Sequence, residues 1–273
     1  MLVDPDNVTA PGAVTEVNWS EDLEEFHQEL SRDHSIEVLT RGVMLDRLGE
    51  LPPRATVVDL GCSTGYLLED LQRRLPDARL VGIDLVLSGL LMARRAVTRG
   101  ILVRGDACQL PLPDAGTDAL VSSNLLEHVP DDRRALAEIR RVLRPGALAV
   151  LVVPTAPGLY DYYDRFLHHE RRYGRGELAA KARDAGLEVV EDTHLGTLVF
   201  PGFWAVKKRN RLRYNHLEGE ALEARVQQDY AGTQDSRLFG LSCRLEEHLL
   251  RRHAPMPFGI RGLTVVRRPA KPA

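Results

Sequence analysis

The stretch from Val57 to Gly65, VVDLGCSTG, holds the residue types best suited to binding a ligand. A short apolar run ends at Asp59, glycines follow at Gly61 and Gly65, and an amphipathic stretch begins directly after them. Glycine lets the backbone approach a ligand closely, and the amino end of a helix offers unpaired N–H groups and a favourable dipole. The pattern predicts a strand, a tight turn and a helix with a ligand at the turn, although tight packing alone would also explain the glycines.

A dinucleotide is one alternative ligand for this turn, and the glycine spacing disfavours it. Dinucleotide turns carry GxGxxG, in which three glycines make room for the pyrophosphate. In that register this chain has Gly61, Ser63 and Tyr66, so two of the three positions are not glycine. We therefore expect that the turn does not bind NAD.

The sequence around this turn alternates between short β-branched runs and longer amphipathic stretches, which would form the elements that position the turn. Such alternation favours βαβ units around a parallel sheet. We expect strands at 56–59, 79–84, 101–103, 119–122, 147–153, 187–192 and 263–266, with helices between them. Ser63 or Thr64 is expected to cap the first of these helices, Gly100 to end the second, and Asp131 or Asp132 to open the third.

The turn also resembles motif I of the class I S-adenosylmethionine (SAM) methyltransferases, D/E-x-G-x-G-x-G. Asp59, Gly61 and Gly65 match it, and Ser63 replaces the middle glycine. Further segments resemble the family in the same order: VGIDL, which contains Asp84, then Gly105-Asp106-Ala107, DALVSSNLLEHV and IRRVLRPGALAVLVVP. The resemblance covers residues 55–191, about half of the chain.

This resemblance implies a fold, a cofactor and a set of cofactor-binding residues. The fold is α/β, a Rossmann-like, doubly wound and mostly parallel seven-stranded sheet with a helical N-terminal cap and an insertion before the last strand. In the family, the acidic residue at the position of Asp84 accepts hydrogen bonds from the ribose hydroxyls, and that at the position of Asp106 accepts from the adenine amino group. The cofactor SAM would be bound by Asp59, Gly61, Cys62, Ser63, Gly65, Asp84, Leu85, Asp106, Ala107 and Asn124.

Three histidines are candidates for a catalytic base. The sulfonium of SAM already carries a good leaving group, so a base helps only when the acceptor must lose a proton. His128 is our first choice because it follows the fourth strand, whose carboxyl end faces the crevice of a doubly wound sheet. His168 and His169, after the fifth strand, are the alternatives, and a surface or structural role is the other interpretation of each.

The segments outside the βα repeat are expected to bind the acceptor. We divide the chain into an N-terminal arm and helical cap (1–50), a SAM-binding core (51–196), a lid insertion (197–256) and a last strand with a tail (257–273). The aromatic residues Tyr160, Tyr162, Tyr163 and Phe166 either line an acceptor pocket or cover the core. Phe200, Phe203 and Trp204 are expected to close over the acceptor, and the basic run 207–213 to form a solvated helix face.

Composition excludes several partners. The formal net charge is -3 over 273 residues, which provides no positive field for nucleic acid. The cysteines, Cys62, Cys108 and Cys243, show no CxxC spacing, so we expect neither a zinc site nor a disulfide framework. We find no leader pattern and no apolar stretch of membrane-spanning length, so we expect a cytoplasmic protein without membrane insertion. The sequence does not decide the oligomeric state, and a homodimer is one of the possibilities.

We predict from these features a SAM-dependent methyltransferase. Its acceptor is expected to be a small molecule, methylated on oxygen or nitrogen, with a natural-product scaffold as the first choice. Two alternatives belong to other classes. In one, the same fold binds SAM without transferring the methyl group and catalyses a cyclisation; in the other, the protein is a non-catalytic SAM-binding partner.

Overall fold

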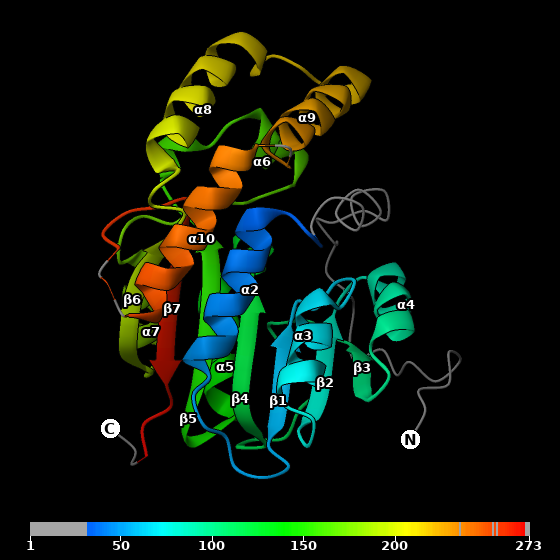
Figure 1. Ribbon diagram of the computed structural model, residues 1–273. Helices are drawn as coiled ribbons and strands as arrows, with labels where there is room; N and C mark the ends of the chain where they lie inside the picture. The colour runs from blue at the N-terminus through cyan, green and yellow to red at the C-terminus, as the bar shows by residue number, and fades with distance from the viewer. Residues whose placement is uncertain (1–31, 235, 253, 255, 271–273) are drawn as a thin grey trace.

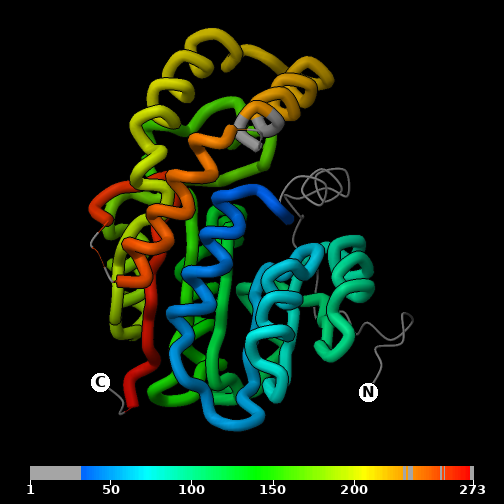
Figure 2. Tube along the Cα trace, in the orientation of Figure 1, coloured from blue at the N-terminus to red at the C-terminus, as the bar shows by residue number. Residues whose placement is uncertain are grey.

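The computed structural model describes residues 32–270 apart from residues 235, 253 and 255 (Figures 1 and 2). The expected N-terminal arm and the first part of the helical cap, residues 1–31, lie outside the described residues. The described part of the expected helical cap contains α2, Ser35–Arg47. Its buried face includes Ile36, Leu39 and Val43, as the helical spacing of the apolar residues predicts.

A single mixed sheet of seven strands forms the centre of the molecule, in the order β3-β2-β1-β4-β5-β7-β6. All of the expected strands are present. Strand β7 runs in the opposite direction to the other six strands of the sheet. The predicted α/β fold is therefore confirmed. The strands are β1 Thr56–Leu60, β2 Arg79–Asp84, β3 Gly100–Arg104, β4 Thr117–Ser123, β5 Leu143–Pro154, β6 Glu188–Leu195 and β7 Arg261–Arg267.

Helices cover both faces of this sheet, as its doubly apolar strands require (Figure 1). Val57 packs into the core on one face and the next residue, Val58, into the core on the other. On the first face lie α2, α3 (Tyr66–Arg74), α4 (Leu87–Ala96) and α10 (Arg237–Arg251). On the second lie α5 (Asp132–Val142) and α7 (Glu177–Asp184).

Two of the expected helix ends are wrong and one is confirmed. Helix α3 is preceded by Gly65, with φ of 84° and no side-chain cap, because Ser63 and Thr64 belong to the turn itself. Helix α4 ends at Ala96, since Gly100 is already paired with Leu80 as the first residue of β3. Asp131 caps α5 as expected and accepts a hydrogen bond from the backbone N–H of Arg134.

The insertion before β7 consists of α8 (Phe200–Tyr214), α9 (Gly219–Gln234) and α10. Figure 1 shows α8 and α9 beyond one end of the sheet, while α10 returns along the sheet beside α2. The short helices η1 (Leu126–His128), η2 (Pro157–Leu159) and α6 (Tyr162–Phe166) follow β4 and β5. Within the described part of the chain, no helix combines the length and apolar character that crossing a membrane requires.

Candidate cofactor and acceptor site

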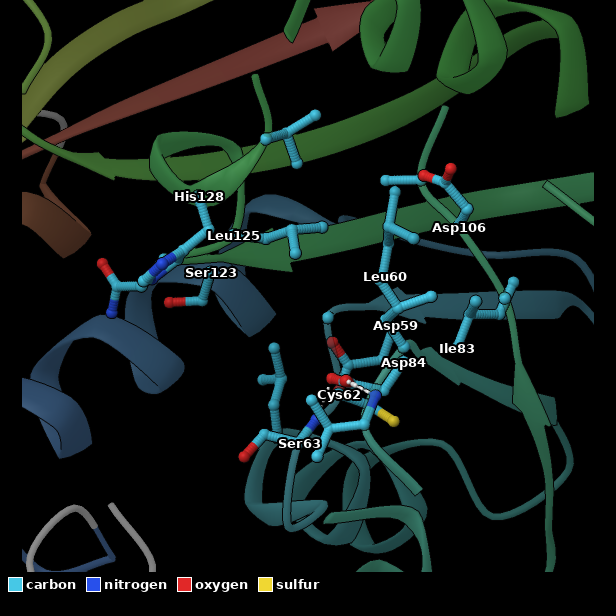
Figure 3. A pocket seen from close by; sticks show the side chains of 18 of the residues that line it. Asp59, Leu60, Cys62, Ser63, Ile83, Asp84, Asp106, Ser123, Leu125 and His128 are labelled. Atoms are coloured by element: carbon cyan, nitrogen blue, oxygen red, sulfur yellow. Dashed lines mark hydrogen bonds between the residues drawn. The ribbon is translucent and has the colours of Figure 1, made fainter. Parts of the chain in front are cut away.

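A cavity of about 360 Å³ lies at the carboxyl ends of β1, β2 and β4 (Figure 3). The helices that follow the neighbouring strands β1 and β4 pack on opposite faces of the sheet, so this is the point at which doubly wound sheets bind ligands. Of the predicted cofactor-binding residues, all except Gly65 line the cavity: Asp59, Gly61, Cys62, Ser63, Asp84, Leu85, Asp106, Ala107 and Asn124.

The turn after β1 needs glycine at two positions for different reasons. Gly61 has φ of 80°, and a Cβ atom there would lie 2.9 Å from Cβ of Leu125. Gly65 has φ of 84°, and its Cβ would lie 2.8 Å from Cβ of Ala93 in α4. Ser63, at the middle glycine of the family motif, also has a positive φ of 45°. Its left-handed backbone explains why glycine is the usual residue at that position.

Asp84 links the turn after β1 to the end of β2. Its Oδ2 accepts the backbone N–H of Ser63 at 2.8 Å, and its Oδ1 accepts that of Val86 at 2.9 Å. Burial raises the pKa of Asp84, and the backbone hydrogen bonds oppose this shift. Each carboxylate oxygen has two lone pairs, so both oxygens retain capacity to accept a further hydrogen bond from a ligand.

Asp59, at the end of β1, is a buried carboxyl group with unused hydrogen-bonding capacity. The residue is 1% exposed, and its Oδ2 has no hydrogen-bond partner among the residues that the structure describes. Burial, together with the nearby charge of Asp84, raises the pKa of Asp59 to about 8. A cationic ligand in the cavity would therefore be needed to favour the ionised form at neutral pH.

The remaining polar groups approach the cavity from two other directions. After β3, Asp106 is held by the backbone N–H of Cys108, which donates to its Oδ1 at 2.8 Å. After β4, Asn124 has φ of 52° and its N–H donates to the carbonyl of Val152 at 2.9 Å. Figure 3 shows Asp106 and His128 well apart around the cavity. Helix α2 adds Glu37 and Arg41, so the N-terminal cap reaches the cavity through its described part.

The structure brings two of the three candidate histidines together. His128, in η1, lines the cavity, and its ring packs edge-on against that of His169 at 4.7 Å between centroids. The side chain of His169 is 8% exposed, and its Nδ1 lies 2.9 Å from Oδ1 of Asp164. Burial lowers the pKa of His169, although the hydrogen bond with Asp164 opposes this. His168 is exposed and, unlike His128, is not among the residues that line the cavity.

Glu127 is a buried residue of this region that our sequence analysis did not single out. It is 0% exposed, and neither carboxylate oxygen has a hydrogen-bond partner among the described residues. Burial raises its pKa to about 8, against the opposing charges of Arg261 and Arg172. The available signal was a carboxylate directly before His128, in the segment that follows the predicted strand 119–122.

No described residue of the aromatic segment (158–173) or of the insertion (197–256) lines the cavity. The hydroxyl of Tyr162 bonds to Asp229 of α9 and to Asn210 of α8, and the hydroxyl of Tyr160 donates to the carbonyl of His169 at 2.7 Å. The hydrogen bonds of Tyr162 attach α6 to the insertion. The expectation of a solvated basic face is wrong at Lys207, because its side chain is 10% exposed and pairs with Asp161 at 2.6 Å.

Comparison with known proteins identifies a matching family model and several relatives of similar sequence. A family model described as a methyltransferase domain matches residues 58–151. A "Probable S-adenosylmethionine-dependent methyltransferase" of Mycolicibacterium smegmatis is 31% identical over 196 residues, 69% of this chain and 70% of that protein. A demethylmenaquinone methyltransferase of Thermus thermophilus is 41% identical over 106 residues, 37% of this chain and 48% of that protein. The matched segment thus spans about half the length of some curated relatives.

Solved structures share the fold at lower identity. A chain in the complex between the Haloferax volcanii Trm112 methyltransferase activator and a methyltransferase superposes with a TM-score of 0.59 and 21% identity, covering 91% of this chain and 95% of that chain. The cyclase SpnF superposes with a TM-score of 0.56 and 20% identity, covering 86% of this chain and 82% of that chain. The fold, the turn after β1 and the Mycolicibacterium relative together confirm the predicted family: the chain belongs to the class I SAM-dependent methyltransferases, whose cofactor is SAM.

Proposed function

We propose that this protein transfers the methyl group of SAM to an oxygen or nitrogen atom of a small molecule, with a natural-product scaffold as the expected acceptor. The observation that carries the proposal is one cavity that gathers three carboxylates, Asp59, Asp84 and Asp106, from three neighbouring strand ends. His128 lines the same cavity from the loop after β4. One ligand could therefore occupy the carboxylate side while a second approaches from the His128 side.

SAM matches the chemistry of the carboxylate side. The free acceptor capacity of Asp84 suits the two neighbouring ribose hydroxyls, and Asp106 suits the adenine amino group. Asp59 is a buried carboxyl group without a cationic partner among the described residues, and SAM carries a sulfonium and an ammonium charge. The roles of Asp84 and Asp106 are those that the resemblance implies, and the role of Asp59 is our inference from its burial; all three residues line the cavity.

The acceptor would enter beside His128 and α2. A cavity of about 360 Å³ is at the small end of ligand pockets, so the acceptor would have to approach from the open side of the cavity that SAM occupies. The Thermus relative is named for demethylmenaquinone, which is a small molecule. For a hydroxyl acceptor, the oxygen loses its proton and bonds to the methyl carbon while the carbon–sulfur bond breaks. The products are a methyl ether and S-adenosylhomocysteine.

Product analysis tests this proposal. The full chain is incubated with SAM and a panel of phenols, hydroxy acids and amines, and products are measured by mass spectrometry. We expect methylated acceptor and S-adenosylhomocysteine in equal amounts. A rearranged acceptor with SAM unchanged would instead support the cyclisation alternative. SAM binding without turnover of any compound would favour a non-catalytic SAM-binding partner and would contradict the proposal.

A further inference from the structure

We propose that Glu127, His128 and His169 form a binding site for one divalent transition-metal ion beside the SAM cavity. One ligand atom from each side chain lies within 4.8 Å of the others. Ligand atoms on one ion, with bonds of about 2.0 to 2.1 Å, are at most about 4.2 Å apart, so small side-chain rotations would close the site. Two neighbouring ligands come from η1 and the third from the segment after α6.

The donor set selects the class of ion. Two imidazole nitrogens and one carboxylate suit zinc, iron, cobalt or nickel, whereas magnesium and calcium prefer oxygen ligands alone. Three protein ligands leave coordination positions for water or a substrate, as in catalytic metal sites. Because His128 lines the cavity, those positions would be reached from the cavity, which also gives the ion an entry path.

Asp164 holds His169 in the orientation that a metal ligand needs. Its Oδ1 lies 2.9 Å from Nδ1 of His169, which leaves Nε2 as the ligand atom. The same oxygen accepts a hydrogen bond from Nε of Arg172 at 2.7 Å, and Asp164 itself has no exposed side-chain surface. A carboxylate bonded to the second nitrogen of a ligating histidine is the usual outer partner of a metal site.

No cation among the described residues forms an ion pair with Glu127. The charges of Arg172 and Arg261 act on it, but Arg172 pairs with Asp164 at 2.7 Å and Arg261 pairs with Glu37. Glu127 is fully buried, and among the described residues neither of its oxygens accepts a hydrogen bond. A buried polar group without a partner is costly, and an unpaired charge more so. A bound cation would give this carboxylate the partner that the described side chains do not supply.

The role of the ion in methyl transfer rests on the proposed function. A bound ion would make an acceptor hydroxyl lose its proton to water more readily, because a cation stabilises the resulting negative charge on oxygen. Transfer would then form the oxygen–carbon bond to the methyl group of SAM and break the carbon–sulfur bond, with the electron pair left on sulfur. The acceptor class that this role implies is a compound with a hydroxyl group that must lose its proton.

Metal titration of the full chain tests the site directly. Chelator-treated protein is titrated with Co²⁺, followed by its visible absorption, and with Zn²⁺ by calorimetry, and Mg²⁺ serves as the oxygen-preferring comparison. We expect one Co²⁺ or Zn²⁺ per chain and much weaker Mg²⁺ binding. Glu127→Gln and His169→Gln should each lower Co²⁺ affinity by about 100-fold. The matched control is His168→Asn, which removes the exposed neighbouring imidazole and should leave Co²⁺ affinity unchanged.

SAM binding is measured on the same samples. Variants that bind SAM with wild-type affinity are folded, so their loss of Co²⁺ binding supports the site. Equal Co²⁺ affinity in wild type, Glu127→Gln and His169→Gln would overturn it, as would wild-type protein that binds SAM but no Co²⁺ or Zn²⁺. Protein that binds the ion but not SAM would contradict the proposed function while leaving the metal site supported.

Discussion

The backbone N–H of Ser63 donates a 2.8 Å hydrogen bond to Oδ2 of Asp84, which joins the turn after β1 to the end of β2. The residue that donates has a left-handed backbone, with φ of 45°. The carboxylate that accepts lines the cavity and has lone pairs to spare for a ligand. One carboxylate thus helps to fix the shape of the turn after β1 and lines the cavity in which we propose that SAM binds.

Replacing Asp84 should weaken SAM binding selectively. Asp84→Asn removes the charge and turns one acceptor into a donor, so we expect a loss of about 1 to 3 kcal/mol in SAM binding, measured by calorimetry. Asp118→Asn is the matched control, because Oδ2 of Asp118 accepts the N–H of Thr56 at 2.8 Å at the other end of β1. Equal losses of SAM affinity in the two variants would contradict the assignment of Asp84.

Replacing Gly61 by alanine should lower the free energy of unfolding more than replacing a glycine that has a similar φ but no atoms near its Cβ position. Gly61→Ala adds a methyl group 2.9 Å from Leu125, whereas Gly146, with φ of 85°, has no atom within 4 Å of the place that a Cβ would take. Both changes carry a left-handed strain of about 1 to 2 kcal/mol, and overpacking adds about 1 to 3 kcal/mol at Gly61. Urea unfolding measures the difference.

A second substitution separates steric crowding from other effects at Gly61. Leu125→Gly removes Cβ and the two Cδ atoms of Leu125, which are the atoms that the new methyl group would crowd. In the Gly61→Ala background it should therefore be less destabilising than in the wild-type chain. If the two substitutions destabilise additively, the contact between these positions does not explain the need for glycine.

The pH dependence of stability should change when Asp59 is replaced by asparagine. Burial raises the pKa of Asp59 to about 8, so between its unfolded pKa and about pH 8 the folded state binds the extra proton. Stability therefore falls as pH rises through this window, and Asp59→Asn removes that contribution. We expect the stability advantage of Asp59→Asn to grow from pH 5 to pH 8 in urea unfolding of ligand-free protein. Parallel curves for the two proteins would show that Asp59 ionises normally.

His128 should affect turnover and leave cofactor binding intact. His128→Ala is expected to lower the rate of methyl transfer by about 100-fold with SAM affinity nearly unchanged, because His128 lines the cavity away from Asp106. His248→Ala, on the exposed surface of α10, is the control. If His128 binds an ion, chelator treatment should lower the wild-type rate to that of the variant. Wild-type turnover by His128→Ala would exclude both roles.

The sheet and the cofactor turn could be predicted because their signals are local. Each strand is a short apolar run buried on both faces, such as Val57-Val58 in β1, and the carboxyl ends of parallel strands share one edge. That is why Asp59, Asp84 and Asp106 could be placed together. Helix caps were less predictable, because Ser63 is as good a cap residue as Asp131 but its backbone is committed to the turn.

The cluster around Glu127 could not be predicted because it depends on long-range packing. His169 reaches His128 because the chain after β5 returns past η1, where the N–H of Glu170 bonds to the carbonyl of Glu127 at 2.8 Å. Lys207 looks like part of a solvated basic run, and its burial depends on Asp161 in a different segment. Neither contact has a periodicity or motif that marks it in the sequence.

Calorimetric titration of the full chain with SAM, alongside NADH, tests the central claim most directly. The geometry of the turn after β1, with Ser63 and Tyr66 where a dinucleotide turn has glycine, predicts that SAM binds with one molecule per chain and that NADH does not bind. Binding of NADH without binding of SAM would contradict the account of the cavity and of the protein's function.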